Sequence, residues 1–438
     1  MGLTTNVDDK TEHVDSDEER GFRLRARQYL SSADLPPRVP NEPVYQWDDD
    51  GFVARDRSIQ RALWDGGFAG ITLPVEYGGR GLPDRFDTIF VEEARPYRMP
   101  WAFGVNRNVI IPPMLAHGSE ALKRRYIPPM LRGDHIWCQL LSEPSGGSDL
   151  AGLLTRATRD GDVWLLNGSK IWTTGGNHAD YGACLARTDP DVPKHAGLTM
   201  FVVDMKQAGM TVVPLRLADR SAHFCQEYLD DVVVPADDVL GEVNDGWRVA
   251  TTMLMHERAA IGRGWDYGKE RAARAAEHLS LSTTVADVVR RAGLASDPHV
   301  RQVLGEMWVL EALMQLTPPR VAAGMASGAL SGHAAAIVKL MSGKVGARRT
   351  ALLSELAGPL GVAAPPDADV PFAVREAGLE RVTLHNIGGG TGEMQANTIA
   401  ERLLGLPREP SPDRELPFNQ LAHNAAPPAP GAQPPQDR

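Results

Sequence analysis

Two dipeptides, Asp160-Gly161 and Asn167-Gly168, constrain the fold more than any other feature of this chain. Each lies between residues that favour β-strands, and in that setting Asp-Gly and Asn-Gly are strong signals of tight hairpin turns. Further strand patterns occur at residues 198–204, 211–216 and 228–234. This spacing predicts a small, mostly antiparallel β-domain over residues 132–242.

The segments on both sides have the apolar spacing of helices. Phe86, Ile89 and Phe90 stand at i, i+3 and i+4 of one helix face. Further helices are predicted at residues 247–264, 334–356 and 398–404. The order α, β, α predicts an α+β protein, divided into a disordered acidic N-terminus (1–19), an N-terminal α-helical domain (20–131), the middle antiparallel β-domain (132–242), a C-terminal helical bundle (243–410) and a disordered tail (411–438).

Composition narrows the class of function. The 438 residues carry a formal net charge of −10, which argues against nucleic-acid binding, since such proteins usually show a basic patch. The three cysteines form no C-x-x-C pair, so neither a disulfide framework nor a thiolate metal site is predicted. No run of the roughly 18 apolar residues needed to span a bilayer occurs. The acidic start has no apolar signal segment, and a cytoplasmic location is expected.

Two motifs flank the predicted hairpins. Residues 137–149 read Trp-Cys-Gln-Leu-Leu-Ser-Glu-Pro-Ser-Gly-Gly-Ser-Asp, and residues 168–176 read Gly-Ser-Lys-Ile-Trp-Thr-Thr-Gly-Gly. Any β-domain with a buried core would explain Trp164, but not these two motifs at this spacing. Together they resemble the flavin-binding middle domain of the acyl-CoA dehydrogenase family. Segments at 67–83, 230–235 and 399–407 also resemble that family, so the resemblance covers most of residues 20–410.

The resemblance implies FAD as cofactor. A flavin needs dipoles along its ring edge and an apolar or aromatic surface against one face. In the family, the positions of Ser142 and Thr174 contact the isoalloxazine ring, Trp172 supplies an aromatic wall, and Ser148 also helps to hold the acyl-CoA. The cofactor-binding residues predicted from the middle domain are therefore Gln139, Leu140, Leu141, Ser142, Ser148, Trp172 and Thr174.

The family's reaction requires a base, and here the sequence departs from many members. Those members carry a glutamate immediately before a Gly-Thr pair near the C-terminus, whereas this chain has Gly389 there, which cannot transfer a proton. A second family arrangement places the base within a Glu-Arg pair on the helix after the β-domain. Isovaleryl-CoA and long-chain dehydrogenases resemble this arrangement. Glu257 and Arg258 match that pair, so Glu257 is the predicted base and Arg258 a substrate-binding residue. The alternative for Glu257 is a solvated or ion-paired helix residue, the commoner fate of glutamate.

The far half of the FAD site is altered. The family's Gln-x-x-Gly-Gly-x-Gly segment, which reaches the neighbouring subunit's cofactor, survives only as Gly358-Pro359-Leu360-Gly361. Thr391 is retained, and Glu393 stands where the family contacts the adenosine half. Gly358, Gly361, Thr391 and Glu393 complete the predicted cofactor site. The altered motifs resemble an actinobacterial-type subgroup, some of whose members combine two different subunits.

The resemblance implies an FAD-dependent acyl-CoA dehydrogenase of lipid metabolism. Such an enzyme forms a trans-2-enoyl-CoA by hydride transfer to flavin N5 and passes electrons to an electron-transfer flavoprotein. It is expected to be a homodimer, a homotetramer or a heterotetramer with a related subunit. Two alternatives stay open, namely a flavin oxidase or monooxygenase on the same fold, and a catalytically silent subunit of a heteromeric dehydrogenase.

Overall fold

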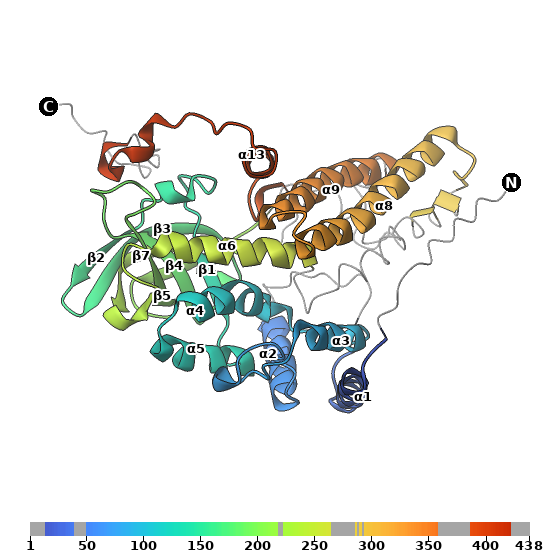
Figure 1. Cartoon of the computed structure of the whole chain (residues 1–438), viewed down its shortest axis with the longest axis horizontal. Coiled ribbons are helices and arrows are strands. Elements are labelled where there is room, and N and C mark those ends of the chain that lie inside the picture. Colours follow the sequence, from blue (N-terminus) through green and yellow to red (C-terminus); the bar gives the residue numbers. More distant parts are fainter. Residues whose placement is uncertain are drawn as a thin grey trace.

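The computed structural model describes residues 14–38, 50–217, 222–263, 285–286, 289–290, 293–357 and 386–421. N-terminal helices precede a β-sheet, and a long helix runs from the sheet to further helices (Figure 1). This is the predicted α, β, α order, and the α+β fold class is confirmed.

The N-terminal helices pack around an aromatic core. Phe22, Phe68, Phe86 and Phe90 contact one another through stacked and edge-on ring pairs with centroids 4.9–5.8 Å apart. The helices are α1 (Asp17–Ser32), α2 (Asp50–Asp65), α3 (Asp84–Ala94), α4 (Ile111–His117) and α5 (Glu120–Arg132). The stripe of apolar residues that predicted α3 is buried in this core.

The start of α1 differs from the prediction of a disordered acidic N-terminus. Residues 14–19 are ordered, because Ser16 accepts a hydrogen bond from Glu19 N at 3.2 Å and the Glu19 carboxylate accepts one from Ser16 N at 2.7 Å. This reciprocal pair is a capping box, and acidic residues in a first turn are favoured by the helix dipole. The acidic composition that suggested disorder therefore stabilises the helix end.

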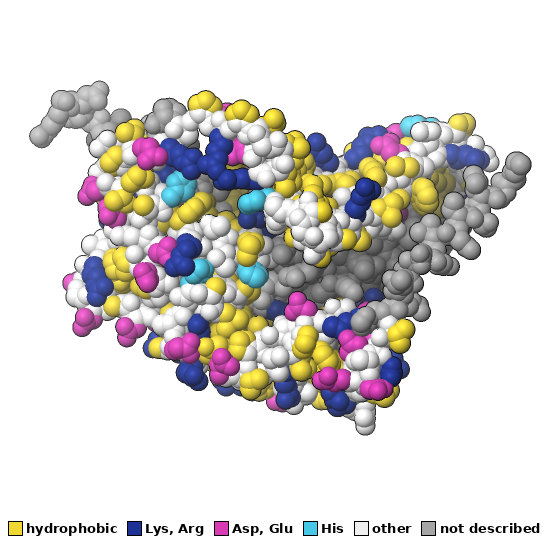
Figure 2. Space-filling view, viewed as in Figure 1, with side chains coloured by type: hydrophobic (Ala, Val, Ile, Leu, Met, Phe, Trp, Pro, Cys, Tyr) yellow, Lys and Arg dark blue, Asp and Glu magenta, His cyan; other side chains and the backbone are white. Residues whose placement is uncertain are grey.

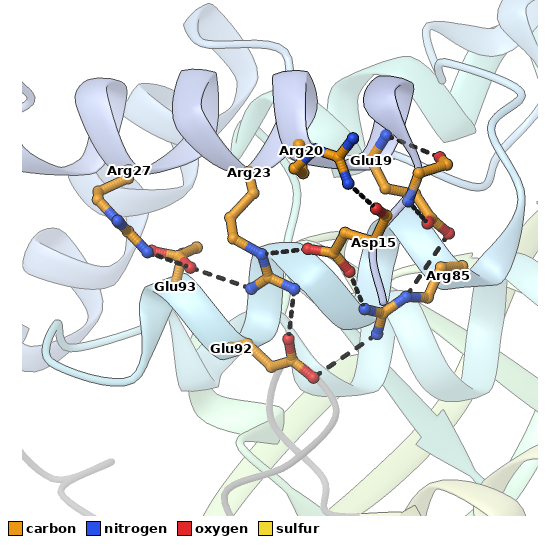
Figure 3. A network of polar contacts seen from close by, with 9 residues as sticks. Asp15, Glu19, Arg20, Arg23, Arg27, Arg85, Glu92 and Glu93 are labelled. Carbon is orange, nitrogen blue, oxygen red and sulfur yellow. Dashed lines mark hydrogen bonds and ion pairs between the residues drawn. The ribbon is translucent and has the colours of Figure 1, made fainter. Parts of the chain in front are cut away.

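A network of ion pairs joins α1 to α3 (Figure 3). Arg23 contacts Asp15 at 2.6 Å, Glu92 at 2.9 Å and Glu93 at 3.0 Å, and its side chain is 21% exposed. Arg85 of α3 also pairs with Asp15, so the segment before α1 is tied to α3 directly. The arginines hold the pKa of Asp15 down at about 2, although desolvation opposes the shift.

We expect Arg23→Met to lower the free energy of unfolding by about 1 kcal/mol, the upper range for ion pairs near a surface. The loss should shrink at high salt, because salt screens these charges. Urea titrations at low and high salt measure this loss of unfolding free energy. Arg248→Met is the matched control, since Arg248 is 61% exposed and pairs with Asp245 away from this network. Equal losses for the two variants would contradict a role of the network in docking α1.

The strands that the structure describes form one mixed, mostly antiparallel sheet. Their order is β6-β7-β3-β2-β4-β5-β8, with β1 parallel to β4. The strands are β1 (Trp137–Leu140), β2 (Arg156–Asp160), β3 (Val163–Thr174), β4 (Tyr181–Arg187), β5 (Leu198–Asp204), β6 (Met210–Leu215), β7 (Phe224–Pro235) and β8 (Val239–Leu240). Asp160 pairs with Val163 across Gly161, which confirms the hairpin turn predicted there.

The turn predicted at Asn167-Gly168 is wrong. Strand β3 runs through both residues, and its pairing with β7 shifts register between Leu166 and Gly168, which marks a β-bulge. A Cβ at position 168 would lie 2.4 Å from Thr155 Oγ1, so the glycine permits a close approach within the sheet. Asn167 Nδ2 donates to Asp231 Oδ1 at 2.8 Å and thereby crosses to β7. The same residue types thus serve a bulge instead of a turn.

The remaining helices are α6 (Gly246–Arg263), α8 (Pro298–Ala326), α9 (Ala335–Ala357) and α13 (Gly392–Arg402). Helix α6 packs on β5 and α4 at one side and on α9 at the other, so it connects the sheet to the C-terminal helices (Figure 1). Its residues Val249, Ala250 and Met253 are fully buried in a core shared with the sheet. None of the helices in the described ranges combines the length and apolar character that membrane crossing requires.

The predicted disordered tail is also ordered at its start. Phe418 is buried, its ring lies 3.4 Å from the Arg187 guanidinium carbon, and its N–H donates to Val192 O at 2.9 Å. Residues 411–421 thereby return to the sheet. A proline-rich composition predicted disorder, whereas Phe418 and Asn419 anchor the segment, the latter by donating to Asp191 Oδ1. Figure 2 shows acidic, basic and apolar side chains interspersed over the visible face.

Candidate active site

Strand β1 leads into the first predicted flavin motif. Asn106 fixes its start, because Trp137 N donates to Asn106 Oδ1 at 2.8 Å and Asn106 Nδ2 donates to His135 O at 2.7 Å. Leu140 and Leu141 are buried in two hydrophobic cores, so only their backbone groups could serve a cofactor. Their predicted cofactor role is thus limited to the backbone.

A buried ion pair fixes the loop of residues 141–155 that follows β1, named the Ser142 loop below. Lys170 Nζ donates to Glu143 Oε1 at 2.9 Å and to Leu141 O at 3.0 Å. The Glu143 carboxylate also accepts from Leu154 N at 2.6 Å and Thr155 N at 2.9 Å. Burial alone would raise the pKa of Glu143, but the Lys170 charge and these amides bring it below its ordinary value.

This pair brings the two sequence motifs together. Ile171 N donates to Ser142 O at 3.0 Å, so Ser142 lies against the end of β3. Trp172 follows directly and is 55% exposed, while Thr174 is half-buried. An exposed aromatic ring beside a loop with a half-buried hydroxyl fits the needs of a flavin, which requires a flat apolar surface and polar groups at its edge.

Ser148 lies at the exposed end of the same loop. Its neighbour Asp149 pairs with Lys194 at 2.7 Å, and a Cβ on Gly147 would lie 3.0 Å from Ser142 Oγ. Ser148 is therefore on the surface close to Ser142, where a ligand that extends away from the flavin could reach it. Its predicted double role toward cofactor and acyl-CoA stays a prediction.

Glu257 of α6 is buried, with an exposed fraction of 7%. Burial raises its pKa above the ordinary value of 4.5, and a hydrogen bond with Gln139 and the charges of Arg258 and Lys339 oppose that rise. Burial excludes the alternative of a solvated helix residue. Because Gln139 belongs to β1, the contact connects Glu257 to the strand that carries the Ser142 loop.

Arg258 is half-buried beside Glu257. Burial lowers its pKa, and the Glu257 carboxylate offsets part of that shift. Arg258 and Glu257 thus form a pair of a cation and a carboxyl group, both partly withdrawn from water, in which the pKa of the carboxyl group is raised. Such pairs are enriched at functional sites.

The remaining predicted residues lie elsewhere or outside the described ranges. Thr391 is the N-cap of α13, where its hydroxyl accepts from Met394 N at 3.2 Å, and Glu393 is exposed on the first turn. Helix α13 packs against α9, and the described part of the chain shows no hydrogen bond between it and the Ser142 loop. Gly358 and Gly361 lie outside the described residues.

Gly389 adds an observation on the base. Its φ is 71°, in the left-handed region where side chains other than glycine are strained. A glutamate at this position would therefore carry a backbone penalty, in addition to being absent from the sequence. The local conformation is consistent with a base located elsewhere.

Three buried charged residues of this region were not predicted, namely Glu143, Lys170 and Glu227. For Glu227 a signal was present, because it stands between Cys225 and Leu229 on the inward face of β7 and interrupts an apolar alternation. For Lys170 a signal was also present, because it continues the even-numbered alternation of β3 in which Trp164 and Leu166 are buried.

Comparison with known proteins identifies the family. The family models for the acyl-CoA dehydrogenase N-terminal, middle and C-terminal domains match residues 16–134, 138–232 and 244–404. The chain belongs to the acyl-CoA dehydrogenase family. Its enzyme class is thereby that of an oxidoreductase acting on acyl-CoA, and its family is one that uses FAD.

Individual members of the family match over nearly the whole chain. Acyl-CoA dehydrogenase FadE29 of Mycobacterium tuberculosis is 32% identical over 395 residues, which cover 90% of this chain and 98% of that protein. The solved Tcur3481-Tcur3483 steroid ACAD is 27% identical with a TM-score of 0.72, covering 90% of this chain and 99% of that one. The ChsE4-ChsE5 complex from Mycobacterium tuberculosis is 26% identical with a TM-score of 0.71, covering 91% and 100%. The resemblance drawn from the two motifs is confirmed.

Proposed function

We propose that this acyl-CoA dehydrogenase binds FAD at the Ser142 loop and β3, and that it converts an acyl-CoA to the trans-2-enoyl-CoA with Glu257 as base. The observation that carries the proposal is the position of Glu257, which is buried on α6 and bonded to Gln139 of the strand that enters the loop. Bound FAD would supply the acceptor for the β-hydrogen, which leaves as hydride.

The residues of this chain account for the other half of the reaction. Glu257 takes the α-proton from the thioester, so that its carboxylate becomes a carboxylic acid while the carbon–carbon double bond forms. Arg258 stands next to it as a cation for an anionic ligand. Trp172 offers a ring surface, and the hydroxyls of Ser142 and Thr174 offer hydrogen bonds to a flavin edge.

The first test is an anaerobic visible spectrum of the purified protein with FAD, before and after addition of acyl-CoAs. The panel should contain straight-chain, branched and steroid side-chain thioesters, because one similar solved protein is a steroid ACAD. Loss of the flavin band with one thioester supports the proposal. Bound FAD that no thioester reduces, together with rapid oxygen consumption by the chemically reduced protein, would favour the oxidase alternative.

A heteromeric assembly is the second candidate. The names of two similar solved structures join two proteins, Tcur3481 with Tcur3483 and ChsE4 with ChsE5. In the proposed assembly a related subunit completes the adenosine half of the cofactor site, where the motif at Gly358 to Gly361 is altered. A protein that takes up FAD only in the presence of a related subunit would support the heteromeric assembly. For either assembly, the proposed acceptor of the electrons is an electron-transfer flavoprotein.

The pH dependence of flavin reduction tests the base separately. Burial raises the pKa of Glu257 above 4.5, so the fraction ionised, and with it the rate, should rise with pH through a pKa above that value. Stopped-flow reduction at saturating acyl-CoA across a pH series measures this limb. Glu257→Asp should keep the limb and lower the rate at every pH, since the carboxylate stands farther from its target. A rate that is flat from pH 4.5 upward would contradict the assignment.

A further inference from the structure

Trp172 has a backbone conformation that needs support. Its φ is 67°, in the left-handed region that bulky side chains rarely adopt. The pairing of β3 with β7 shifts between Ile171 and Thr173, so Trp172 is the extra residue of a β-bulge. Bulges redirect side chains, and here the ring is 55% exposed while Thr173 is buried. Backbone strain of this kind persists only where the surroundings hold it.

Glu227 provides a contact immediately after the bulge. Thr173 Oγ1 donates to Glu227 Oε2 at 2.7 Å, and Glu227 is fully buried on β7. The other oxygen, Oε1, faces the turn after β3, because a Cβ on Gly176 would lie 2.5 Å from it. Among the residues that the structure describes, Oε1 has no hydrogen-bond partner. The carboxyl group therefore contacts both the strand end and the turn that follows it.

Glu227 does more in this contact than fill space in the core. Burying an acid is costly, and an apolar side chain of similar volume would avoid that cost. Burial raises the pKa of Glu227 to about 8, with Thr173 and Lys170 opposing the shift. The other titratable neighbours are the thiols of Cys138, Cys184 and Cys225, whose own pKa values are raised by burial. Glu227 thus retains an acceptor for Thr173 without carrying an exposed charge.

We propose that Glu227 is a positioning residue for the flavin, which holds the Trp172 bulge and the Thr174 hydroxyl in place through its hydrogen bond with Thr173. This inference rests on the proposed FAD site and extends it to a residue that does not itself touch the cofactor. Phe224, which pairs with Thr174 in the ladder and packs edge-on against Trp172 at 5.9 Å, completes the support.

The test compares Glu227→Leu, which removes the acceptor, with Glu227→Gln, which keeps a carbonyl oxygen for Thr173. We expect Glu227→Leu to weaken FAD binding by about tenfold, the range for one buried hydrogen bond lost, and Glu227→Gln to stay close to wild type. The absorption band of bound FAD should change shape in the leucine variant. In flavin-free protein, amides of residues 171–176 should exchange hydrogen faster in that variant. Thr173→Val removes the same bond from the other side and should reproduce these effects if the leucine variant does not fold.

The outcomes separate this inference from the proposed function. A wild-type protein that binds no FAD, alone or with a related subunit, overturns both. If wild type binds FAD, but Glu227→Leu and Thr173→Val bind it equally well with an unchanged band shape, only the positioning role is overturned. A lower melting temperature without a change in FAD affinity or spectrum would also overturn it, since it indicates a purely structural residue.

Discussion

Glu257→Gln is expected to slow the reduction of bound FAD by acyl-CoA about 10³-fold, within the range that general-base catalysis contributes. Glutamine has nearly the same shape and can still contact Gln139, but it cannot accept the α-proton. Affinity for FAD should stay unchanged, because Glu257 lies on α6 and the proposed flavin contacts lie on the Ser142 loop and β3. Anaerobic stopped-flow reduction and an FAD titration measure the two quantities.

Glu306→Gln is the matched control for this substitution. Glu306 is a helical glutamate of α8 that pairs with Arg348 at 2.6 Å, away from the residues assigned to the site. It should reduce FAD at the wild-type rate. If Glu257→Gln also kept that rate, the base would have to be another residue, and the arrangement inferred from the Glu-Arg pair would be wrong.

Lys170→Met is expected to lower the free energy of unfolding by about 3–5 kcal/mol, because removal of one partner leaves the other as an uncompensated buried charge. The Lys170 side chain is 0% exposed and that of Glu143 is 4% exposed. Urea titration at pH 7 measures the loss. Weaker FAD binding should accompany it, since Lys170 also holds Leu141 O beside the Ser142 loop.

Glu143 determines how the stability loss in Lys170→Met depends on pH. Its folded-state pKa lies below the ordinary 4.5, so its stabilising contribution is complete above pH 4.5 and is lost as pH falls through the folded-state value. In Lys170→Met the carboxyl loses its cation and its pKa rises. The deficit relative to wild type should therefore be largest at neutral pH and shrink toward acid pH.

Two controls separate the ion pair from general damage to the core. Lys206→Met removes a lysine that is 65% exposed and paired with Asp180, and it should cost about 0–1 kcal/mol. The double variant Lys170→Met/Glu143→Gln removes both charges and should regain part of the loss. A double variant as unstable as Lys170→Met alone would show that packing, and not the unpaired carboxylate, causes the effect.

Local sequence patterns anticipated the elements well. The apolar spacing around Phe86 predicted α3, and Asp160-Gly161 predicted the β2–β3 hairpin. These features depend on neighbours in the chain, so they can be read without the fold. Asn167-Gly168 shows the limit, since its residues suit a turn or a bulge equally. The pairing of β3 with the distant strand β7 decided between them, and Thr155 occupies the space that a Cβ at position 168 would need.

The two terminal segments show the same limit for predictions that rest on composition. Acidic and proline-rich stretches predicted disorder at both ends, but Asp15 meets Arg23 and Arg85, and Phe418 meets Arg187. A composition averages over many residues, whereas one or two contacts with a distant segment are enough to order a short stretch. Those partners are not visible in the local sequence.

The family and the α, β, α order could be inferred from the amino-acid sequence alone, and the sequence also supplied the proposal that Glu257 is the base. The motifs at residues 137–149 and 168–176 were sufficient for the family because they rest on residue types at fixed spacings, and Gly389 in place of a glutamate directed the proposal to Glu257. The burial of Glu257 against Gln139, and the contact through which Lys170 joins the two motifs by way of Glu143, became visible only in the folded chain. The tertiary structure alone placed Glu227 behind the Trp172 bulge. Burial and pKa depend on what surrounds a side chain in space, and those surroundings come from strands and helices far apart in the chain.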